Sequence, residues 1–242
     1  MKRVPTPARR DPSFPSGQRL RAVLFDAGNT LVFLDYDRLA HGVGSELGLP
    51  LTGPGLAVHA AEASRAMEQA AGSDQHRAAA YLEALFRLGG VPAERMGEVG
   101  KCLARLHSER HLWCSIRDHT REALQRLRAA GLRLGVVSNS DGRVAEALQA
   151  AGLSDCFDVV IDSELVGIEK PDPRIFQAAL AALAVRPEES LYVGDLYEVD
   201  VVGARAAGIE PVLLAPGPGP GQSCRTAATL DDLVNTLLAE RI

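Results

Sequence analysis

The sequence predicts an α/β fold: a Rossmann-like parallel sheet flanked by helices, with a helical cap inserted after the first core strand. Two observations lead to this prediction. Beyond residue 113, apolar strand-like runs alternate with helical patterns, which is typical of βαβ units and a parallel sheet. Between the first and second strand-like runs, by contrast, a long stretch carries helical periodicity alone.

The core elements follow from apolar runs and their glycine boundaries. Strands are predicted at residues 21–26, 132–138, 157–161, 190–194 and 211–214, and helices at 119–130, 143–151, 174–183, 198–207 and 230–240. Gly131, Gly152 and Gly208 each follow a helical pattern, where the left-handed residue that ends a helix belongs. Because crossovers between parallel strands are nearly always right-handed, helices are expected on both faces of the sheet.

Three segments lie outside this alternation. Residues 34–112 are rich in alanine, leucine, glutamate and arginine, so we predict a helical cap there and a catalytic core formed by residues 20–33 and 113–242. Residues 1–19 are basic and proline-rich and lack the apolar segment of a secretory signal, which predicts a disordered leader. The Pro-Gly repeat at 216–221 is predicted to be a surface loop.

Composition narrows the classes of partner. The 242 residues can bury a full core, and the net charge of -5 gives no reason to expect nucleic acid or an anionic membrane as a partner. Four widely spaced cysteines without a Cys-x-x-Cys pair are typical of free thiols in a reducing cytosol. No apolar stretch approaches the roughly 18 residues that span a bilayer. We therefore expect a cytoplasmic protein; the sequence carries no signal for an oligomeric state.

Polar side chains stand at or just after the ends of several predicted strands. They are Asp26, Ser138, Asn139, Lys170, Asp195 and Asp200, and the segment Ala27-Gly28-Asn29-Thr30 follows the first of them. In an open α/β sheet, ligands bind outside the carboxyl ends of the strands. We therefore expect these residues to converge on one crevice.

The residue types fit phosphoryl transfer, which needs a nucleophile, donors for the phosphoryl oxygens, and cations. Asp26 can be the nucleophile and form an aspartyl-phosphate. The hydroxyls of Thr30 and Ser138 can hold the oxygens, and Lys170 supplies a fixed positive charge. Substrate binding is expected from Ser138, Asn139, Lys170 and the backbone of Ala27.

Carboxylates in the same set predict a metal site. Asp26 and Asp195 offer the hard oxygen ligands that Mg²⁺ prefers. Asp200 can complete the metal shell or orient Lys170. The predicted cofactor is Mg²⁺, and the predicted partner is a small phosphorylated molecule.

Four segments together resemble the haloacid dehalogenase-like hydrolase superfamily, in its helical-cap type, over nearly the whole chain after residue 20. They are Phe25-Asp26-Ala27-Gly28-Asn29-Thr30-Leu31, Val137-Ser138-Asn139, Lys170-Pro171-Asp172-Pro173 and Gly194-Asp195-Leu196-Tyr197-Glu198-Val199-Asp200. The resemblance implies a Rossmann-like core, Asp26 as nucleophile, and Mg²⁺ held by Asp26, Asp195 and the backbone carbonyl of Gly28. The helical stretch falls where the family places its cap.

Gly28 departs from the pattern of the family's phosphatases. These usually carry a second aspartate two residues after the nucleophile, which protonates the leaving group and then activates water. General acid–base help is worth roughly 10² to 10⁴ in rate. Asp35 and Asp37, at the hinge into the cap, are candidates to replace the missing acid, although a solvated hinge role is favoured.

The leading hypothesis is a Mg²⁺-dependent phosphatase that acts on a small phosphorylated metabolite. The alternative is a catalytically weakened relative that binds a phosphorylated ligand or partner. Dehalogenases of the family also lack the second acid, but they depart from the motif that this chain keeps at residues 194–200. Phosphonatases of the family have a small residue at the position of Gly28, and they need a lysine in the cap. The only lysine of the predicted cap is Lys101, which lies much further along the chain than the lysine of the phosphonatases would.

Two other patterns are expected to be structural. His107 and His111 are spaced to share a helix face, but Glu109 is not where a His-Glu-x-x-His zinc motif needs its glutamate. We expect solvated cap histidines there. Trp113 and Cys114 are expected to pack rather than react.

Overall fold

The computed structural model describes residues 19–70, 72–215, 217, 219 and 222–240. The predicted leader, apart from residue 19, lies outside the described residues, and so do positions 216, 218, 220 and 221 of the Pro-Gly repeat. Among the helices described, none is both long and apolar enough to cross a bilayer.

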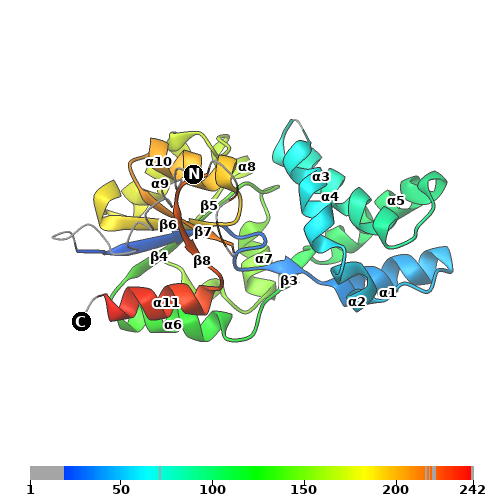
Figure 1. Cartoon of the computed structure of the whole chain (residues 1–242), viewed down its shortest axis with the longest axis horizontal. Helices are drawn as coiled ribbons and strands as arrows, with labels where there is room; N and C mark the ends of the chain where they lie inside the picture. Colours follow the sequence, from blue (N-terminus) through cyan, green and yellow to red (C-terminus); the bar gives the residue numbers. More distant parts are fainter. Residues whose placement is uncertain (1–18, 71, 216, 218, 220–221, 241–242) are drawn as a thin grey trace, which may run out of the picture.

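A six-stranded parallel sheet forms the core and confirms the predicted fold class (Figure 1). Its order is β5-β4-β1-β6-β7-β8, with bounds β1 Ala22–Phe25, β4 Arg133–Ser138, β5 Val159–Asp162, β6 Ser190–Gly194, β7 Glu210–Leu214 and β8 Arg225–Ala227. β1 pairs with β4 on one side and β6 on the other, so it lies near the centre. The residue that follows β1 therefore enters a crevice flanked by two other strand ends.

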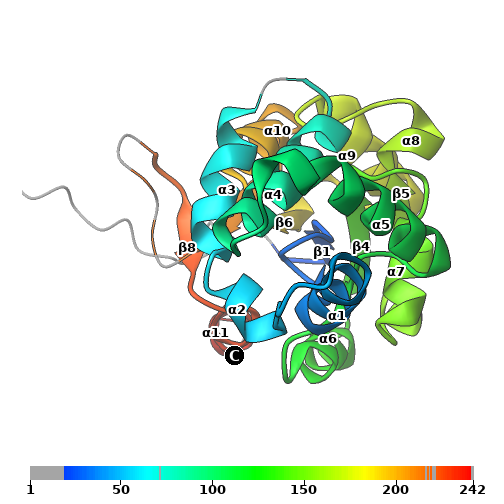
Figure 2. The ribbon, with the colours of Figure 1, turned by 90° about the vertical axis from the view of Figure 1, so that its right-hand side faces the viewer.

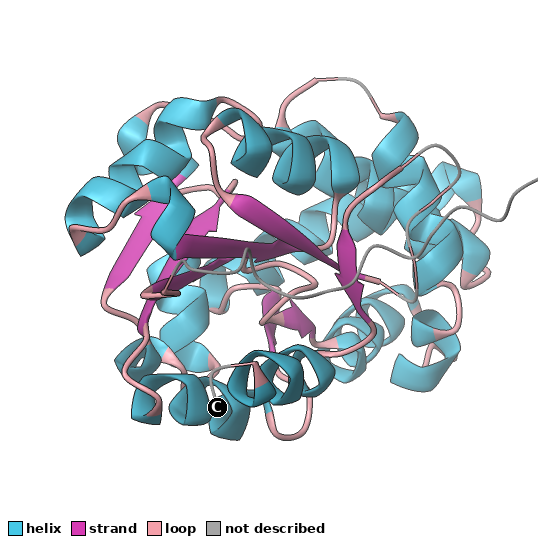
Figure 3. Cartoon of the chain, turned by 60° about the vertical axis from the view of Figure 1, so that its left-hand side comes forward, coloured by secondary structure: helices cyan, strands magenta, loops and turns pink. Residues whose placement is uncertain are grey.

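Helices cover both faces of the sheet (Figure 3). They are α6 Thr120–Ala129, α7 Val144–Ala150, α8 Ser163–Val166, α9 Pro173–Leu183, α10 Val202–Ala206 and α11 Leu230–Ala239. Val23 and Phe25 of β1 belong to the apolar cluster formed with α6, α7 and α11, whereas Ala22 and Leu24 belong to the cluster formed with α9 and α10. This alternation is the period-2 pattern of a strand buried on both sides.

A helical insertion separates β1 from β4 and lies at one side of the sheet in Figure 1. Its helices are α1 Tyr36–Leu47, α2 Gly53–Ala57, α3 Ala60–Gln69, α4 Asp74–Leu88 and α5 Met96–Glu109. Leu39, Val43, Phe86 and Leu103 belong to an apolar core of its own. Figure 2 shows these helices in front of β1, β4 and β6.

Two short antiparallel strands, β2 Phe33–Leu34 and β3 Trp113–Ser115, carry the chain into and out of the insertion. These two strands and β8 have no signal in the sequence, because two or three residues are too few to show alternation. The helix predicted over residues 198–207 is also different in the structure. The structure instead has a π-helical turn, η4 Tyr197–Val201, followed by α10. Such turns recur at functional sites.

Candidate active site

The residues predicted from strand ends do meet at one cavity of about 530 Å³. It lies between the carboxyl edge of the sheet and the insertion. Its lining includes Asp26, Ala27, Gly28, Ser138, Asn139, Lys170, Asp195 and Asp200 from the core, and Met67, Leu82 and Leu103 from the insertion. Thr30 is not among the lining residues.

Lys170 is the buried cation of this cluster. Its Nζ lies 2.6 Å from Oδ1 of Asp26 and 2.8 Å from Oδ1 of Asp200, and its side chain is 2% exposed. Burial lowers the pKa of Lys170, but the two carboxylates outweigh burial and raise the pKa above its usual value. Lys170 is therefore a permanently charged group held against the predicted nucleophile.

Tyr192 belongs to the same cluster and was missed by the sequence analysis. Lys170 Nζ donates to its hydroxyl at 2.9 Å, and the hydroxyl lies 3.0 Å from both the Val137 carbonyl oxygen and Oδ1 of Asp200. In the sequence Tyr192 stands inside an apolar strand, where it looks like a core residue. The one available signal was the hydroxyl itself, because a buried tyrosine usually finds a hydrogen-bond partner.

Asp200 is fixed from both of its oxygens. Oδ1 accepts from Lys170, and Oδ2 accepts from the backbone N–H of Leu196 at 3.0 Å. The carboxylate packs directly on Gly194, where a Cβ would lie 2.3 Å from Cγ of Asp200. Glycine at 194 is thus what allows this carboxylate to approach the strand end.

Asn139 positions Lys170 through the backbone. Its Oδ1 accepts from Lys170 N at 2.7 Å, and its Nδ2 donates to Lys170 O at 3.1 Å. These two bonds use one N–H and one lone pair of the amide, and Asn139 also lines the cavity.

Two hydroxyls near the strand ends keep donor capacity. Ser138 is buried, and its Oγ makes one long contact, 3.4 Å to the carbonyl oxygen of Asn139. Thr30 Oγ1 is buried and has no hydrogen-bond partner among the described residues. Ser138 lines the cavity, so its hydroxyl is suited to bind a polar ligand, whereas Thr30 does not line the cavity.

The acidic cluster carries more negative charge than its lysine can balance. Carboxylate oxygens of Asp26, Asp195 and Asp200 lie within 4.8 Å of one another. Burial, followed by repulsion from Asp200, raises the pKa of Asp26 to about 7 against the pull of Lys170. Burial and the charges of Asp26 and Asp200 also raise the pKa of Asp195 well above its usual value. Three carboxylates and one ammonium leave a formal charge that a divalent cation would neutralise, so this donor set fits Mg²⁺.

Comparison with known proteins identifies the family of the chain. A family model described as haloacid dehalogenase-like hydrolase matches residues 20–208. The chain belongs to this family of hydrolases. It is 33% identical over 218 residues to haloacid dehalogenase-like hydrolase domain-containing protein 3 of Bos taurus, with 84% of each chain covered.

The chain is also similar in sequence to a named phosphatase and in fold to a solved structure. A phosphoserine phosphatase of Thermus thermophilus is 36% identical over 175 residues, which cover 72% of this chain and 68% of that protein. The HAD-hydrolase YfnB of Bacillus subtilis, whose structure was solved with bound magnesium, superposes with a TM-score of 0.65 at 20% identity. The superposition covers 91% of this chain and 100% of YfnB, and it supports the fold.

Gly28 lines the cavity at a place that has room for a side chain. Gly28 does not have a left-handed backbone, and a Cβ there would lie 3.9 Å from Cδ1 of Trp113, an ordinary contact. Asp35 caps α1 by accepting from Arg38 N at 3.0 Å, and it pairs with Arg110 at 2.8 Å. Neither Asp35 nor Asp37 is among the lining residues of the cavity.

His107 and His111 are less exposed to solvent than the sequence predicts. His107 and His111 are 26% and 11% exposed, and both face Asp141 in the loop after β4. The i, i+4 spacing of the two histidines is visible in the sequence. Their contact with Asp141 is not, because Asp141 lies near the histidines only when the insertion packs on the core.

Proposed function

We propose that this hydrolase is a Mg²⁺-dependent phosphatase of a small phosphorylated metabolite, with Asp26 as the nucleophile. The observation that carries the proposal is the 2.6 Å contact between Lys170 Nζ and Asp26, in a cavity that also holds the carboxylates of Asp195 and Asp200. A site that only binds a phosphate would not need a carboxylate at its centre, because the carboxylate repels the anion. A phosphatase needs this carboxylate as the nucleophile, and the adjacent fixed cation offsets its charge.

The proposed reaction has two steps. One oxygen of the Asp26 carboxylate attacks the phosphorus, the bond to the ester oxygen breaks, and the alcohol leaves as an alkoxide that must gain a proton. Water then attacks the phosphorus of the aspartyl-phosphate, inorganic phosphate leaves, and Asp26 is regenerated as the water's proton passes to solvent. Lys170, Ser138 and the backbone at Ala27, which line the cavity, are proposed to hold the phosphoryl oxygens.

We propose that residues 34–112 act as a cap over this site. The insertion contributes apolar side chains to the wall of the cavity opposite Asp26, including Met67, Leu82 and Leu103. These side chains would exclude water and contact the part of the substrate beyond its phosphate. Specificity would therefore reside in the insertion.

We propose that Asp26 and Asp195 bind Mg²⁺, with Asp200 and the Gly28 carbonyl as further ligands. The ion would supply positive charge to offset the charge of the phosphoryl oxygens.

Replacing Asp195 by alanine removes a carboxylate that has no lysine or arginine partner among the described ion pairs. We expect calorimetric titration to show one Mg²⁺ bound by the wild type and a large loss of affinity in Asp195→Ala. Equal affinities would remove Asp195 from the proposed metal site.

The rate should depend steeply on the leaving group. Because Gly28 cannot donate a proton, the departing oxygen must leave as an anion or borrow a proton from water. Aryl and acyl phosphates are therefore expected to outrun alkyl phosphates by more than in relatives that have the second aspartate. The measurement is kcat/KM across esters of graded leaving-group pKa. A flat dependence would show that another residue of the cavity supplies the proton.

The direct test of the function is hydrolysis of p-nitrophenyl phosphate and a panel of phosphomonoesters, with and without Mg²⁺. Asp26→Asn keeps the size of the side chain and removes its nucleophilic charge. We expect Mg²⁺-dependent turnover in the wild type and background rates in the variant. Turnover that survives in Asp26→Asn would overturn the proposed nucleophile.

One observation favours a second function. Gly28 removes the acid and base of the reaction, which fits a protein that binds a phosphorylated ligand or partner without efficient turnover. In that case phosphorylated ligands should bind in calorimetry while no ester in the panel is hydrolysed. The phosphonatase alternative has no comparable support, because Lys101 is exposed and is not among the lining residues of the cavity.

A further inference from the structure

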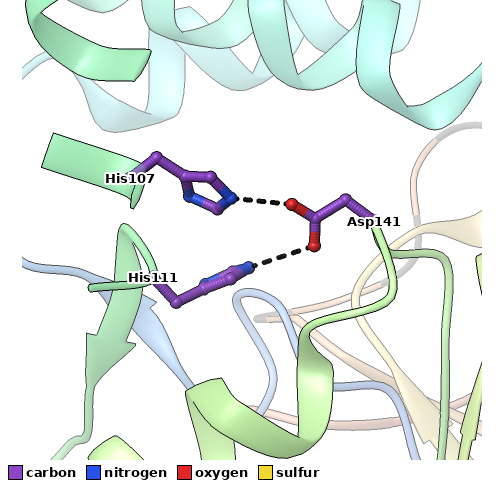
Figure 4. A group of neighbouring side chains, drawn as sticks. All are labelled: His107, His111 and Asp141. Carbon is purple, nitrogen blue, oxygen red and sulfur yellow. Dashed lines mark hydrogen bonds and ion pairs between the residues drawn. The ribbon is translucent and has the colours of Figure 1, made fainter. Parts of the chain in front are cut away.

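His107, His111 and Asp141 face one another on a wall of the cavity (Figure 4). His107 lies near the end of α5, His111 lies just beyond that helix, and Asp141 lies in the loop between β4 and α7. His107 Nε2 is 2.7 Å from Oδ2 of Asp141, and His111 Nε2 is 3.8 Å from Oδ1. One ligand atom from each residue falls within 4.8 Å of the others.

We propose that His107, His111 and Asp141 bind one divalent transition-metal ion, of the class of Zn²⁺ or Co²⁺. Two imidazoles with one carboxylate suit such ions, whereas Mg²⁺ prefers oxygen ligands alone. Three protein ligands leave a coordination position open, as in catalytic rather than structural zinc sites. The site is distinct from the acidic cluster of Asp26, and the proposal does not depend on the proposed phosphatase reaction.

The separations between the ligand atoms agree with metal binding. Tetrahedral zinc with bonds of about 2.0–2.1 Å holds its ligand atoms about 3.4 Å apart. The two distances to Asp141, 2.7 Å and 3.8 Å, lie on either side of that value. The ring centroids of His107 and His111 are 4.7 Å apart. Small side-chain rotations would therefore bring the three atoms around an ion.

The surroundings prepare these side chains as ligands. Nδ1 of His111 lies 3.1 Å from the carbonyl oxygen and 3.2 Å from the N–H of Trp113, which fix its ring. In the tautomer that carries its proton on Nδ1, the ring can donate to that carbonyl and turn an unprotonated Nε2 toward Asp141, the arrangement common for metal-bound histidines.

Another histidine and carboxylate, elsewhere in the chain, serve as a comparison for the cluster of His107, His111 and Asp141. His119 Nδ1 lies 3.4 Å from Oε2 of Glu122, with both side chains 68% exposed. That pair offers two ligands in open solvent. The cluster offers three ligands recessed in a cavity, and it joins the insertion to the core. Arg143, which donates to the carbonyl oxygen of His107 at 2.7 Å, supports the same junction without a metal.

The test is a titration of the metal-stripped full-length protein with Co²⁺ in excess Mg²⁺, which is added to compete with Co²⁺ for the acidic cluster. We expect one Co²⁺ per chain, seen as visible absorption bands of a nitrogen- and oxygen-bound ion, and competition by Zn²⁺. His111→Ala and Asp141→Asn should each weaken binding by about tenfold or more. His119→Ala and Asp195→Ala should bind Co²⁺ as the wild type does.

Three results would overturn the proposal. They are the absence of stoichiometric Co²⁺ binding, equal binding by His111→Ala and His119→Ala, and a thiolate-to-cobalt charge-transfer band that assigns the ion to cysteine. Asp141→Asn keeps the shape of the carboxylate, so it serves if His111→Ala does not fold. Bound Zn²⁺ should also raise the Tm of the wild type and not that of Asp141→Asn.

Discussion

Replacing Lys170 by methionine is expected to reduce phosphate-ester hydrolysis by about 10³ or more. The change removes a cation that contacts both Asp26 and Asp200 and leaves their charges to repel each other. Loss of a single electrostatic contact to a transition state costs about 10² to 10³ in turnover, and this lysine also holds the nucleophile. Breaking a buried ion pair also costs about 3–5 kcal/mol of stability. Steady-state kinetics and denaturant melts measure the two effects.

Lys101→Met is the matched control. Lys101 is exposed on α5 and is not among the lining residues of the cavity, so its loss should leave turnover and the free energy of unfolding nearly unchanged. If folded Lys170→Met retained turnover within tenfold of the wild type, Lys170 would have no direct role in the reaction.

Gly28→Asp is expected to raise turnover of alkyl phosphates by about 10² to 10⁴, the usual worth of general acid–base help. The position allows the change: its backbone is not left-handed, and a Cβ would meet Trp113 only at ordinary contact distance. The gain should be smaller for aryl phosphates, because their leaving groups need little protonation. The measurement is kcat/KM for matched alkyl and aryl esters.

Gly28→Asn separates proton transfer from shape, since an amide of the same size cannot give up a proton as a carboxylic acid does. We expect no rate gain in this variant. A stable Gly28→Asp protein that binds Mg²⁺ without any gain on alkyl phosphates would contradict the missing-acid account. It would favour the binding function instead.

The sequence was sufficient to predict the fold class and the polar residues that stand at the ends of strands. The apolar run before Asp26 and the run of β6 before Asp195 are buried parallel strands, whose signal is local. The topology of a parallel sheet then brings their carboxyl ends together. Helix η4 was predicted only as an ordinary helix, because the wider π-helical turn has no pattern of its own.

Contacts between distant segments could not be predicted in this way. Tyr192 looks like a core residue until Lys170 is seen against its hydroxyl. The hydrogen bonds between the Asn139 amide and the backbone of Lys170, which lies in another loop, likewise depend on the fold. The pairing of His107 with Asp141 needs the insertion placed on the core. Each depends on tertiary placement that no local period encodes.

The most direct test of the account is to look for phosphate on Asp26. Without an acid or base at Gly28, the water that hydrolyses the aspartyl-phosphate is not activated, so the phosphorylated enzyme should accumulate during turnover. Acid quenching of the enzyme with p-nitrophenyl phosphate and Mg²⁺, followed by mass spectrometry of the peptides, should show a phosphoryl group on Asp26 that is absent from Asp26→Asn. Sustained turnover with no adduct on Asp26, at a rate that Asp26→Asn preserves, would contradict the account.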